Sequence, residues 1–118
     1  MLAFMTKSEV KYILKAHGME AYTPNTITSF DKLEKDLEQI RTRGYAIDDS
    51  EFHVGLHSVA APIYDEKENV QYAFSVVSMF YKVNSPEFEK AKNLALSAAR
   101  EISRKLGYKG DAFENVPI

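Results

Sequence analysis

The sequence predicts a small α+β domain in which helices flank an antiparallel sheet. Apolar residues recur at helical spacing near both ends of the chain, and the middle contains two long apolar runs joined by a short polar segment. The chain has 118 residues, which is the length of one domain. We therefore expect the elements in the order helix, helix, strand, strand, strand, helix.

Two helices are expected ahead of the strands. Thr6 and Glu9 fit a capping box that opens a helix over residues 7–17. Thr28 or Ser29 can cap the second helix. A glycine stands where each helix should stop, because glycine readily adopts the left-handed conformation that commonly ends helices.

Three strands are expected in the middle of the chain. Residues 45–47 form a short first strand, and the polar residues 48–51 form the turn that follows it. Residues 56–64 and 70–79 form a hairpin. Pro62 must occupy an edge or a bulge of the sheet, because proline has no N–H to donate to a neighbouring strand.

The last helix is expected to follow Ser85 as its N-cap, with Pro86 at its first position. Its apolar stripe, which we assign to the core rather than to ligand binding, consists of Phe88, Ala91, Ala95, Ala98, Ile102 and Leu106. Residues 108–118 show no periodicity and are expected to form a loose C-terminal tail. The folded domain is therefore assigned to residues 1–107.

Composition and charge exclude several classes of function. The chain has 15 basic and 17 acidic residues, so it lacks the bulk positive charge that favours nucleic acids or anionic membranes. It has no cysteine, which excludes disulfides, thiolate metal sites and a cysteine nucleophile, and which fits a reducing compartment. Its apolar runs are too short to cross a bilayer, and its glycines are too sparse for a phosphate-binding loop.

Two groups of polar residues suggest chemistry. Glu51, His53 and His57 could hold a metal ion in a small hydrolase, although histidines four residues apart on a strand lie about 13 Å from each other. In the plainer interpretation they are ordinary surface or partly buried residues. Ser58 and Ser75 lie within apolar strands, where each hydroxyl either bonds a neighbouring carbonyl or faces a small polar ligand. The residues alone favour the bond to a carbonyl.

A longer pattern resembles the IclR family of transcriptional regulators. Residues 40–51, IRTRGYAIDDSE, resemble the family signature, and residues 58–65, SVAAPIYD, resemble the string that leads into its hairpin. Residues 22–26, YTPNT, resemble the loop ahead of the signature helix. Residues 99–103 and 106–108 resemble the closing helix. The resemblance therefore covers most of the chain.

The resemblance implies a C-terminal effector-binding domain with a GAF-like fold. Such domains bind small molecules, often small carboxylic acids, and assemble dimers or tetramers. Ligand binding changes operator affinity through a winged helix-turn-helix that this chain does not contain. Residues 2–4, LAF, resemble the close of a family helix, so we expect the beginning of the effector domain to be missing as well. The resemblance also implies a cytoplasmic protein without catalytic activity, cofactor, membrane contact or direct DNA contact by this chain.

Four residues fall at positions that the resemblance assigns to the effector pocket. Asp48 matches the first aspartate of the signature, and Leu56 matches an apolar wall residue. Ser58 and Ser75 match small polar residues on the two hairpin strands. Three positions depart from the family pattern, which favours a more apolar or differently shaped ligand: Val77, Ser78 and Glu68.

Three functions therefore compete. The first is a ligand-sensing and oligomerisation domain of a transcriptional regulator, and the second is the small metal-dependent hydrolase. The third is a stand-alone interaction module, in which the apolar N-terminus and a sheet edge form a dimer surface. The signature favours the first.

Overall fold

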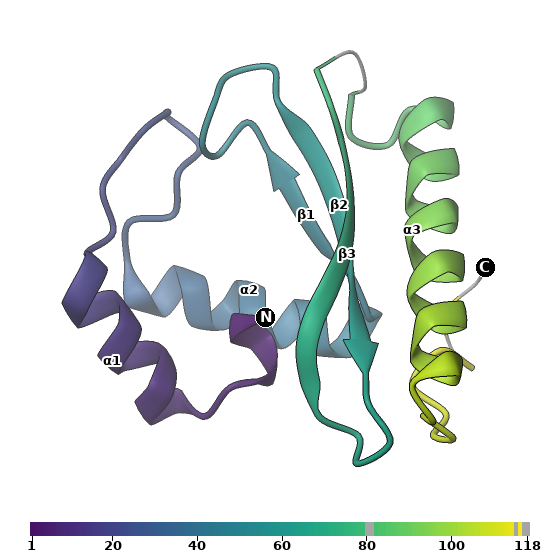
Figure 1. Ribbon diagram of the computed structural model, residues 1–118. Coiled ribbons are helices and arrows are strands. Elements are labelled where there is room, and N and C mark those ends of the chain that lie inside the picture. Colours follow the sequence, from purple (N-terminus) through teal and green to yellow (C-terminus); the bar gives the residue numbers. More distant parts are fainter. Residues whose placement is uncertain (80–81, 115, 117–118) are drawn as a thin grey trace.

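The computed structural model describes residues 1–79, 82–114 and 116. A short 3-10 turn, η1 (Leu2–Phe4), precedes the predicted order of helices and strands. Figure 1 shows that α3 runs along one face of the sheet, while α1 and α2 lie on the other side. The elements are α1 (Lys7–His17), α2 (Phe30–Arg43), β1 (Ala46–Asp49), β2 (His57–Tyr64), β3 (Val70–Ser78) and α3 (Pro86–Lys105).

The first two helices begin and end as the sequence predicts. The Thr6 hydroxyl accepts a hydrogen bond from the Glu9 N–H, and the Glu9 carboxylate accepts one from the Thr6 N–H, which completes the capping box. Of the two candidate caps for α2, Ser29 is the cap, because its hydroxyl accepts from the Lys32 N–H at 3.2 Å. Gly44 ends α2 with a φ of +90°, a conformation that favours glycine.

The sheet is antiparallel in the order β1-β2-β3. The predicted first strand, residues 45–47, is displaced to β1, which takes in two residues that we expected in the turn. Asp48 pairs with Ser58 and Asp49 pairs with His57, so both aspartates belong to the ladder. The low strand propensity of aspartate made the sequence pattern point to a turn, whereas pairing with β2 overrides that preference.

The hairpin of β2 and β3 agrees with the sequence prediction to within one residue at its strand ends. Pro62 pairs with Ala73 of β3 and lies beyond the last β1 partner, Ala60. A register shift follows between Ile63 and Tyr64. The prediction that Pro62 occupies an edge or a bulge is therefore confirmed, since β2 has no β1 neighbour at this point.

The buried face of α3 is rotated relative to the predicted stripe. Phe88, Ala91 and Ala95 are buried as expected, whereas Leu106 is 43% exposed. The core extends around the helix because aromatic residues from beyond its end pack there. The additional buried residues of α3 are Leu96, Ala99 and Ser103.

Those aromatic residues come from the segment that we expected to be a loose tail. Tyr108 and Phe113 are 4% and 3% exposed and pack against Ala61, Leu96 and Ala99. Irregular chain can bury such side chains without leaving any periodic pattern in the sequence. Residues 115 and 117–118 of the predicted tail lie outside the described part of the chain.

A second, smaller core lies on the other side of the sheet. Ala3 of η1, Val10 of α1, and Leu37 and Ile40 of α2 are buried against one another. This cluster fixes α2 and η1 beside β1. Among the described residues, no helix is long and apolar enough to cross a membrane.

Candidate functional site

The three predicted polar residues project from one face of the sheet. Asp48 of β1 lies directly opposite Ser58 of β2. Ser58 lies opposite Val77 of β3, and Ser75 is two residues before Val77 on the same strand. Because paired residues share a face and residues two apart on a strand share a face, all three side chains point the same way.

This face is the one that α3 leaves uncovered. Val59, on the opposite face, is buried against Phe88, Ala91 and Ala95 of α3. Ser75 is exposed and Ser58 is partly buried. Within the described part of the chain, neither serine hydroxyl makes a hydrogen bond, which corrects the expectation of a bond to a neighbouring carbonyl. Both hydroxyls are free to contact a ligand.

Leu56, the fourth predicted residue, immediately precedes β2 and is partly buried. Its carbonyl accepts a hydrogen bond from the Ser50 N–H at 2.9 Å, which closes the loop between β1 and β2. Leu56 therefore lies at the loop end of the sheet face, two residues before Ser58.

Asp48 has a structural partner as well as a place on the open face. Its Oδ1 accepts a hydrogen bond from the Glu51 N–H at 2.9 Å, which orients the start of the β1–β2 loop. Burial raises the pKa of Glu51, and the negative charges of Asp48, Asp36 and Asp49 raise it further, against the hydrogen bond from the Asp49 N–H. This end of the face is therefore acidic.

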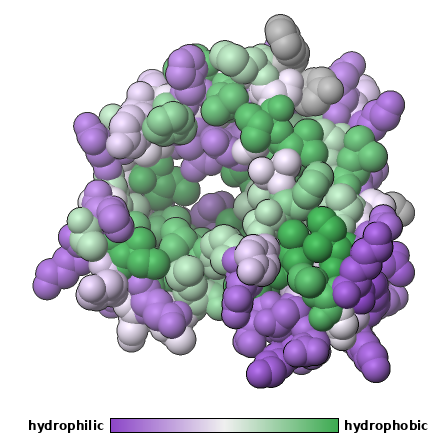
Figure 2. Space-filling model, in the orientation of Figure 1, coloured by the Kyte–Doolittle hydropathy of each residue, from purple (hydrophilic) through white to green (hydrophobic). Residues whose placement is uncertain are grey.

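Asp48 and Glu51 line a hollow of about 370 Å³ between η1, α2 and β1. A neighbouring hollow of about 420 Å³ shares Leu2, Leu33 and Asp36 with it and extends under the loop between α1 and α2. Figure 2 shows the opening between the sheet and the segments that carry α1 and this loop. Both hollows have the size of small-molecule sites.

The YTPNT segment, which we expected only to be a loop, holds this region together. The Thr23 hydroxyl donates to the Ser50 carbonyl, and the Thr26 hydroxyl donates to the Glu51 carbonyl. Asn25 Nδ2 donates to the Asp49 carbonyl at 2.9 Å. Three side chains thus tie the loop ahead of α2 to the β1–β2 loop, 24 to 27 residues away in sequence.

The metal-site hypothesis for Glu51, His53 and His57 is wrong. His57 Nε2 lies 3.1 Å from Asp49 Oδ1, on the sheet face that α3 covers, while Glu51 lines the hollows of the opposite face. His53 is exposed in the loop. Across residues 1–79, 82–114 and 116, no group of three or more His, Cys, Asp or Glu side chains could hold a metal ion.

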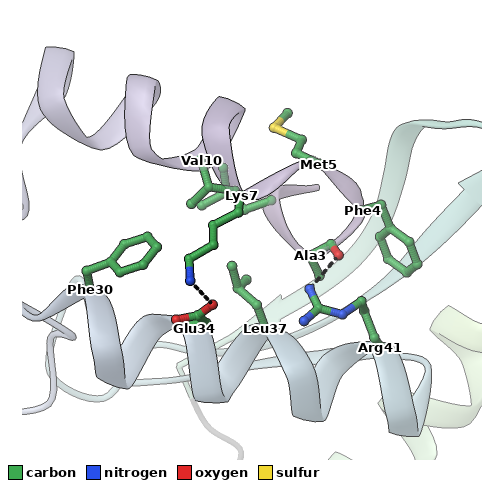
Figure 3. A pocket seen from close by; sticks show the side chains of 10 residues that line it. Ala3, Phe4, Met5, Lys7, Val10, Phe30, Glu34, Leu37 and Arg41 are labelled. Atoms are coloured by element: carbon green, nitrogen blue, oxygen red, sulfur yellow. Dashed lines mark hydrogen bonds and ion pairs between the residues drawn. The ribbon is translucent and has the colours of Figure 1, made fainter.

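A further hollow, of about 400 Å³, lies between η1, the start of α1 and α2 (Figure 3). Arg41 Nη1 donates to the Ala3 carbonyl at 2.9 Å at one end, and Lys7 Nζ lies 3.1 Å from Glu34 Oε1 at the other. Arg41 lies in the last turn of α2, where the helix dipole also favours a positive charge. No sequence pattern predicts the hydrogen bond from Arg41 to η1, because it joins residues far apart in the chain.

The sequence of the chain matches the family "Bacterial transcriptional regulator IclR C-terminal" over residues 1–104. The chain belongs to the IclR family. It is 34% identical to the HTH-type transcriptional repressor AllR of Escherichia coli K12 over 105 residues, which are 89% of the chain and 39% of AllR. The chain thus spans well under half the length of the curated relatives that it matches.

Solved IclR-family structures share the fold. The C-terminal domain of the E. coli regulator KdgR superposes with a TM-score of 0.81 at 32% identity. The match covers 91% of this chain and 65% of the solved KdgR domain. Thermotoga maritima IclR superposes with a TM-score of 0.80 at 38% identity, over 91% and 43% of the two chains.

These relationships confirm the predicted family and the α+β class. They assign the chain to the effector-binding C-terminal region of IclR-family proteins. The members of this family are transcriptional regulators rather than enzymes.

Proposed function

We propose that the chain senses a small carboxylic acid on the open face of its sheet. The observation that carries this proposal is that β1, β2 and β3 bring Asp48, Ser58 and Ser75 onto the face that α3 leaves open. Effector binding there changes the operator affinity of a winged helix-turn-helix outside this chain. The chain also contributes to a homodimer or tetramer of a cytoplasmic regulator.

The charges of the face favour a particular orientation of the ligand. A carboxylate needs hydrogen-bond donors when it leaves water, and the hydroxyls of Ser58 and Ser75 supply two. The acidic end formed by Asp48, Glu51 and Asp36 repels an anion. We therefore place the ligand carboxylate toward Ser75, on β3, and away from β1.

Asp48 then suits a hydroxyl group of the ligand. Oδ1 is engaged by the Glu51 N–H, and the second carboxylate oxygen can accept from a ligand O–H. A hydroxy acid, or a 2-oxo acid in its hydrated form, presents a carboxylate at one end and hydroxyl donors beside it. Leu56 and Val77 supply apolar contact, which favours a ligand with a short apolar part.

A thermal-shift screen with hydroxy, 2-oxo and aromatic carboxylic acids tests the proposal. A ligand at about 100 times its Kd adds roughly 2.7 kcal/mol to the free energy of unfolding, which is easily visible. Ser58→Ala and Ser75→Ala should each weaken the shift, because each removes a donor to the carboxylate.

Ser97→Ala is the matched control, since Ser97 is exposed on α3 and far around the helix from the sheet. The proposal fails if an acid stabilises the protein equally in the wild type and in both sheet variants. A screen in which amines stabilise the protein and acids do not would also contradict it.

A further inference from the structure

Three consecutive carbonyl groups of the β1–β2 loop accept hydrogen bonds from side chains of one other segment, residues 22–26. This segment belongs to the α1–α2 loop, which meets the β1–β2 loop at one end of the sheet (Figure 1). The acceptors are the carbonyls of Asp49, Ser50 and Glu51. The backbone that follows Asp48 is therefore held by side chains that are distant in sequence.

The two threonine hydroxyls of this segment are oriented before they reach the β1–β2 loop. A hydroxyl has one proton and two lone pairs. Thr26 Oγ1 accepts from the N–H groups of Tyr22 and Thr23 at 3.1 and 3.0 Å. Thr23 Oγ1 accepts from the Asn25 N–H at 3.0 Å. Because local N–H groups occupy these lone pairs, each hydroxyl proton is presented to a carbonyl of the other loop.

Thr23 acts on Asp48 through a single peptide group. The Ser50 carbonyl and the Glu51 N–H belong to one trans peptide group, which is planar and points them in opposite directions. The Thr23 hydroxyl donates to the carbonyl, and Asp48 Oδ1 accepts from the N–H at 2.9 Å. A rotation of this peptide group would break both hydrogen bonds. Thr23 therefore helps to fix the carboxylate of Asp48.

Asn25 acts on Leu56 in the same way. The Asp49 carbonyl and the Ser50 N–H form the preceding peptide group. Asn25 Nδ2 donates to this carbonyl at 2.9 Å, and the N–H donates to the Leu56 carbonyl at 2.9 Å. Two of the four predicted effector residues, Asp48 and Leu56, are thus connected to the 22–26 segment through rigid peptide groups.

The conformation of Ser50 makes this support necessary. Ser50 has a φ of +58°, in the left-handed region that residues with a side chain rarely adopt. Such conformations persist where the surrounding structure holds them. Ser50 is held by the Thr23 hydroxyl at its carbonyl and by the Gly55 N–H, which donates to its Oγ at 3.0 Å. Without the donors of the 22–26 segment, the loop should relax and release the partner of Asp48.

We propose that Thr23 and Asn25 are positioning residues of the effector site, which hold the β1–β2 loop so that Asp48 keeps one carboxylate oxygen for the ligand. This inference rests on the proposed function. Within the described part of the chain, neither side chain lines the two hollows beside Asp48, whereas Thr26 lines one of them. Thr23 and Asn25 therefore act through the loop rather than by touching the ligand.

Amide hydrogen exchange of the whole chain, measured by NMR, tests the positioning without a ligand. Thr23→Val keeps the branched shape and removes the hydroxyl. It should raise the exchange rate of the Glu51 N–H about tenfold relative to that of Ala95 in the core, while Thr23→Ser should restore the slow rate. Thr42→Val is the matched control, because the Thr42 hydroxyl donates to the Glu38 carbonyl of its own helix at 3.0 Å. It should leave the Glu51 rate unchanged.

A second variant covers the case in which Thr23→Val fails to fold. Asn25 is exposed, so Asn25→Ala removes only a side chain at the surface. It should raise the exchange rate of the Ser50 N–H relative to Ala95, because it releases the peptide group that this N–H belongs to. Unchanged rates at Ser50 and Glu51 in the two variants would overturn the proposal. A rise of the same factor at Ala95 would also overturn it, since that result indicates a loss of global stability.

Binding of lactate, followed by NMR titration, tests the consequence for the ligand. Lactate has a carboxylate, a hydroxyl beside it and a short apolar part. Thr23→Val should raise its Kd about tenfold while shifting the urea midpoint no more than Thr42→Val does. Lactate binding that Thr23→Val leaves unchanged overturns the positioning role and leaves the effector site standing. A wild type that does not bind lactate, but shows the expected exchange rates, contradicts the proposed ligand and supports the positioning.

Discussion

Ser103 shows how one polar residue can organise a core. Its side chain is completely buried in α3. The hydroxyl donates to the Ala99 carbonyl at 2.7 Å and accepts from the Tyr64 N–H at 3.0 Å, where the β2–β3 register shifts. Ser103 therefore satisfies a backbone donor at a point where the sheet has an irregular ladder.

Ser103→Ala should lower the free energy of unfolding by about 1–3 kcal/mol, because it leaves the Tyr64 N–H without a partner in the core. Urea denaturation followed by circular dichroism measures the loss. Ser97→Ala, on the exposed side of the same helix, should change stability by less than about 0.5 kcal/mol. Equal effects of the two substitutions would contradict the assigned role.

Glu51 should make the stability of the domain depend on pH. Its folded pKa is raised, first by burial and then by neighbouring carboxylates. Between its unfolded pKa and the raised value, the folded state binds more protons, so stability falls as the pH rises through this window. Glu51→Gln should therefore be more stable than the wild type at pH 7, and the difference should shrink below the unfolded pKa.

Melting temperatures measured from acid to neutral pH test this behaviour. Glu38→Gln, at an exposed position of α2, is the control and should run parallel to the wild type. A Glu51→Gln variant whose advantage grows toward acid pH would show that the sign is wrong.

At the scale of elements, helix ends are where sequence and structure agree best. The capping residues and terminal glycines act through local interactions, which depend only on a few neighbouring residues in the sequence. The first strand was predicted less well, because Asp48 and Asp49 gain their place only from pairing with β2. The buried side of α3 was also predicted incompletely, since it depends on residues that follow the helix.

The N-cap of α3 is a local interaction whose contribution to stability can be measured. The Ser85 hydroxyl accepts from the Phe88 N–H at 3.1 Å. Because α3 covers the main core, Ser85→Ala should lower the free energy of unfolding of the domain by about 1 kcal/mol. Ser85→Asp should restore most of it, since aspartate is an equally good cap. Thermal unfolding of the three proteins distinguishes a cap from a position where any substitution is harmful.

At the scale of the whole molecule, residues that follow α3 are buried in the core although no periodic pattern in the sequence predicts their burial. Tyr108 and Phe113 enter the core beside α3, and Tyr64 stacks on Tyr108 with ring centroids 4.7 Å apart. The candidate site was partly predictable, because the signature marked Asp48, Ser58 and Ser75. That these three side chains share one face, and that Thr23 bonds the β1–β2 loop, could be learned only from the tertiary structure.

A truncation tests the role of the C-terminal segment. A chain ending at Gly107 loses two buried aromatic side chains, each worth about 1.5–3 kcal/mol of burial. Together these side chains contribute about 3–6 kcal/mol, which is comparable with the lower part of the stability range of a small domain, about 5–15 kcal/mol. The shortened chain should therefore be largely unfolded by circular dichroism, whereas a chain ending at Glu114 should fold. A stable truncated domain would restore the description of this segment as a loose tail.

We place the effector on the sheet face that α3 leaves open. Amide chemical-shift mapping by NMR tests it most directly, with the acid that gives the largest thermal shift. We expect the shifts to be concentrated on β1, β2 and β3 around Asp48, Ser58 and Ser75. Shifts confined to the hollow between η1, α1 and α2, around Lys7 and Arg41, would contradict it.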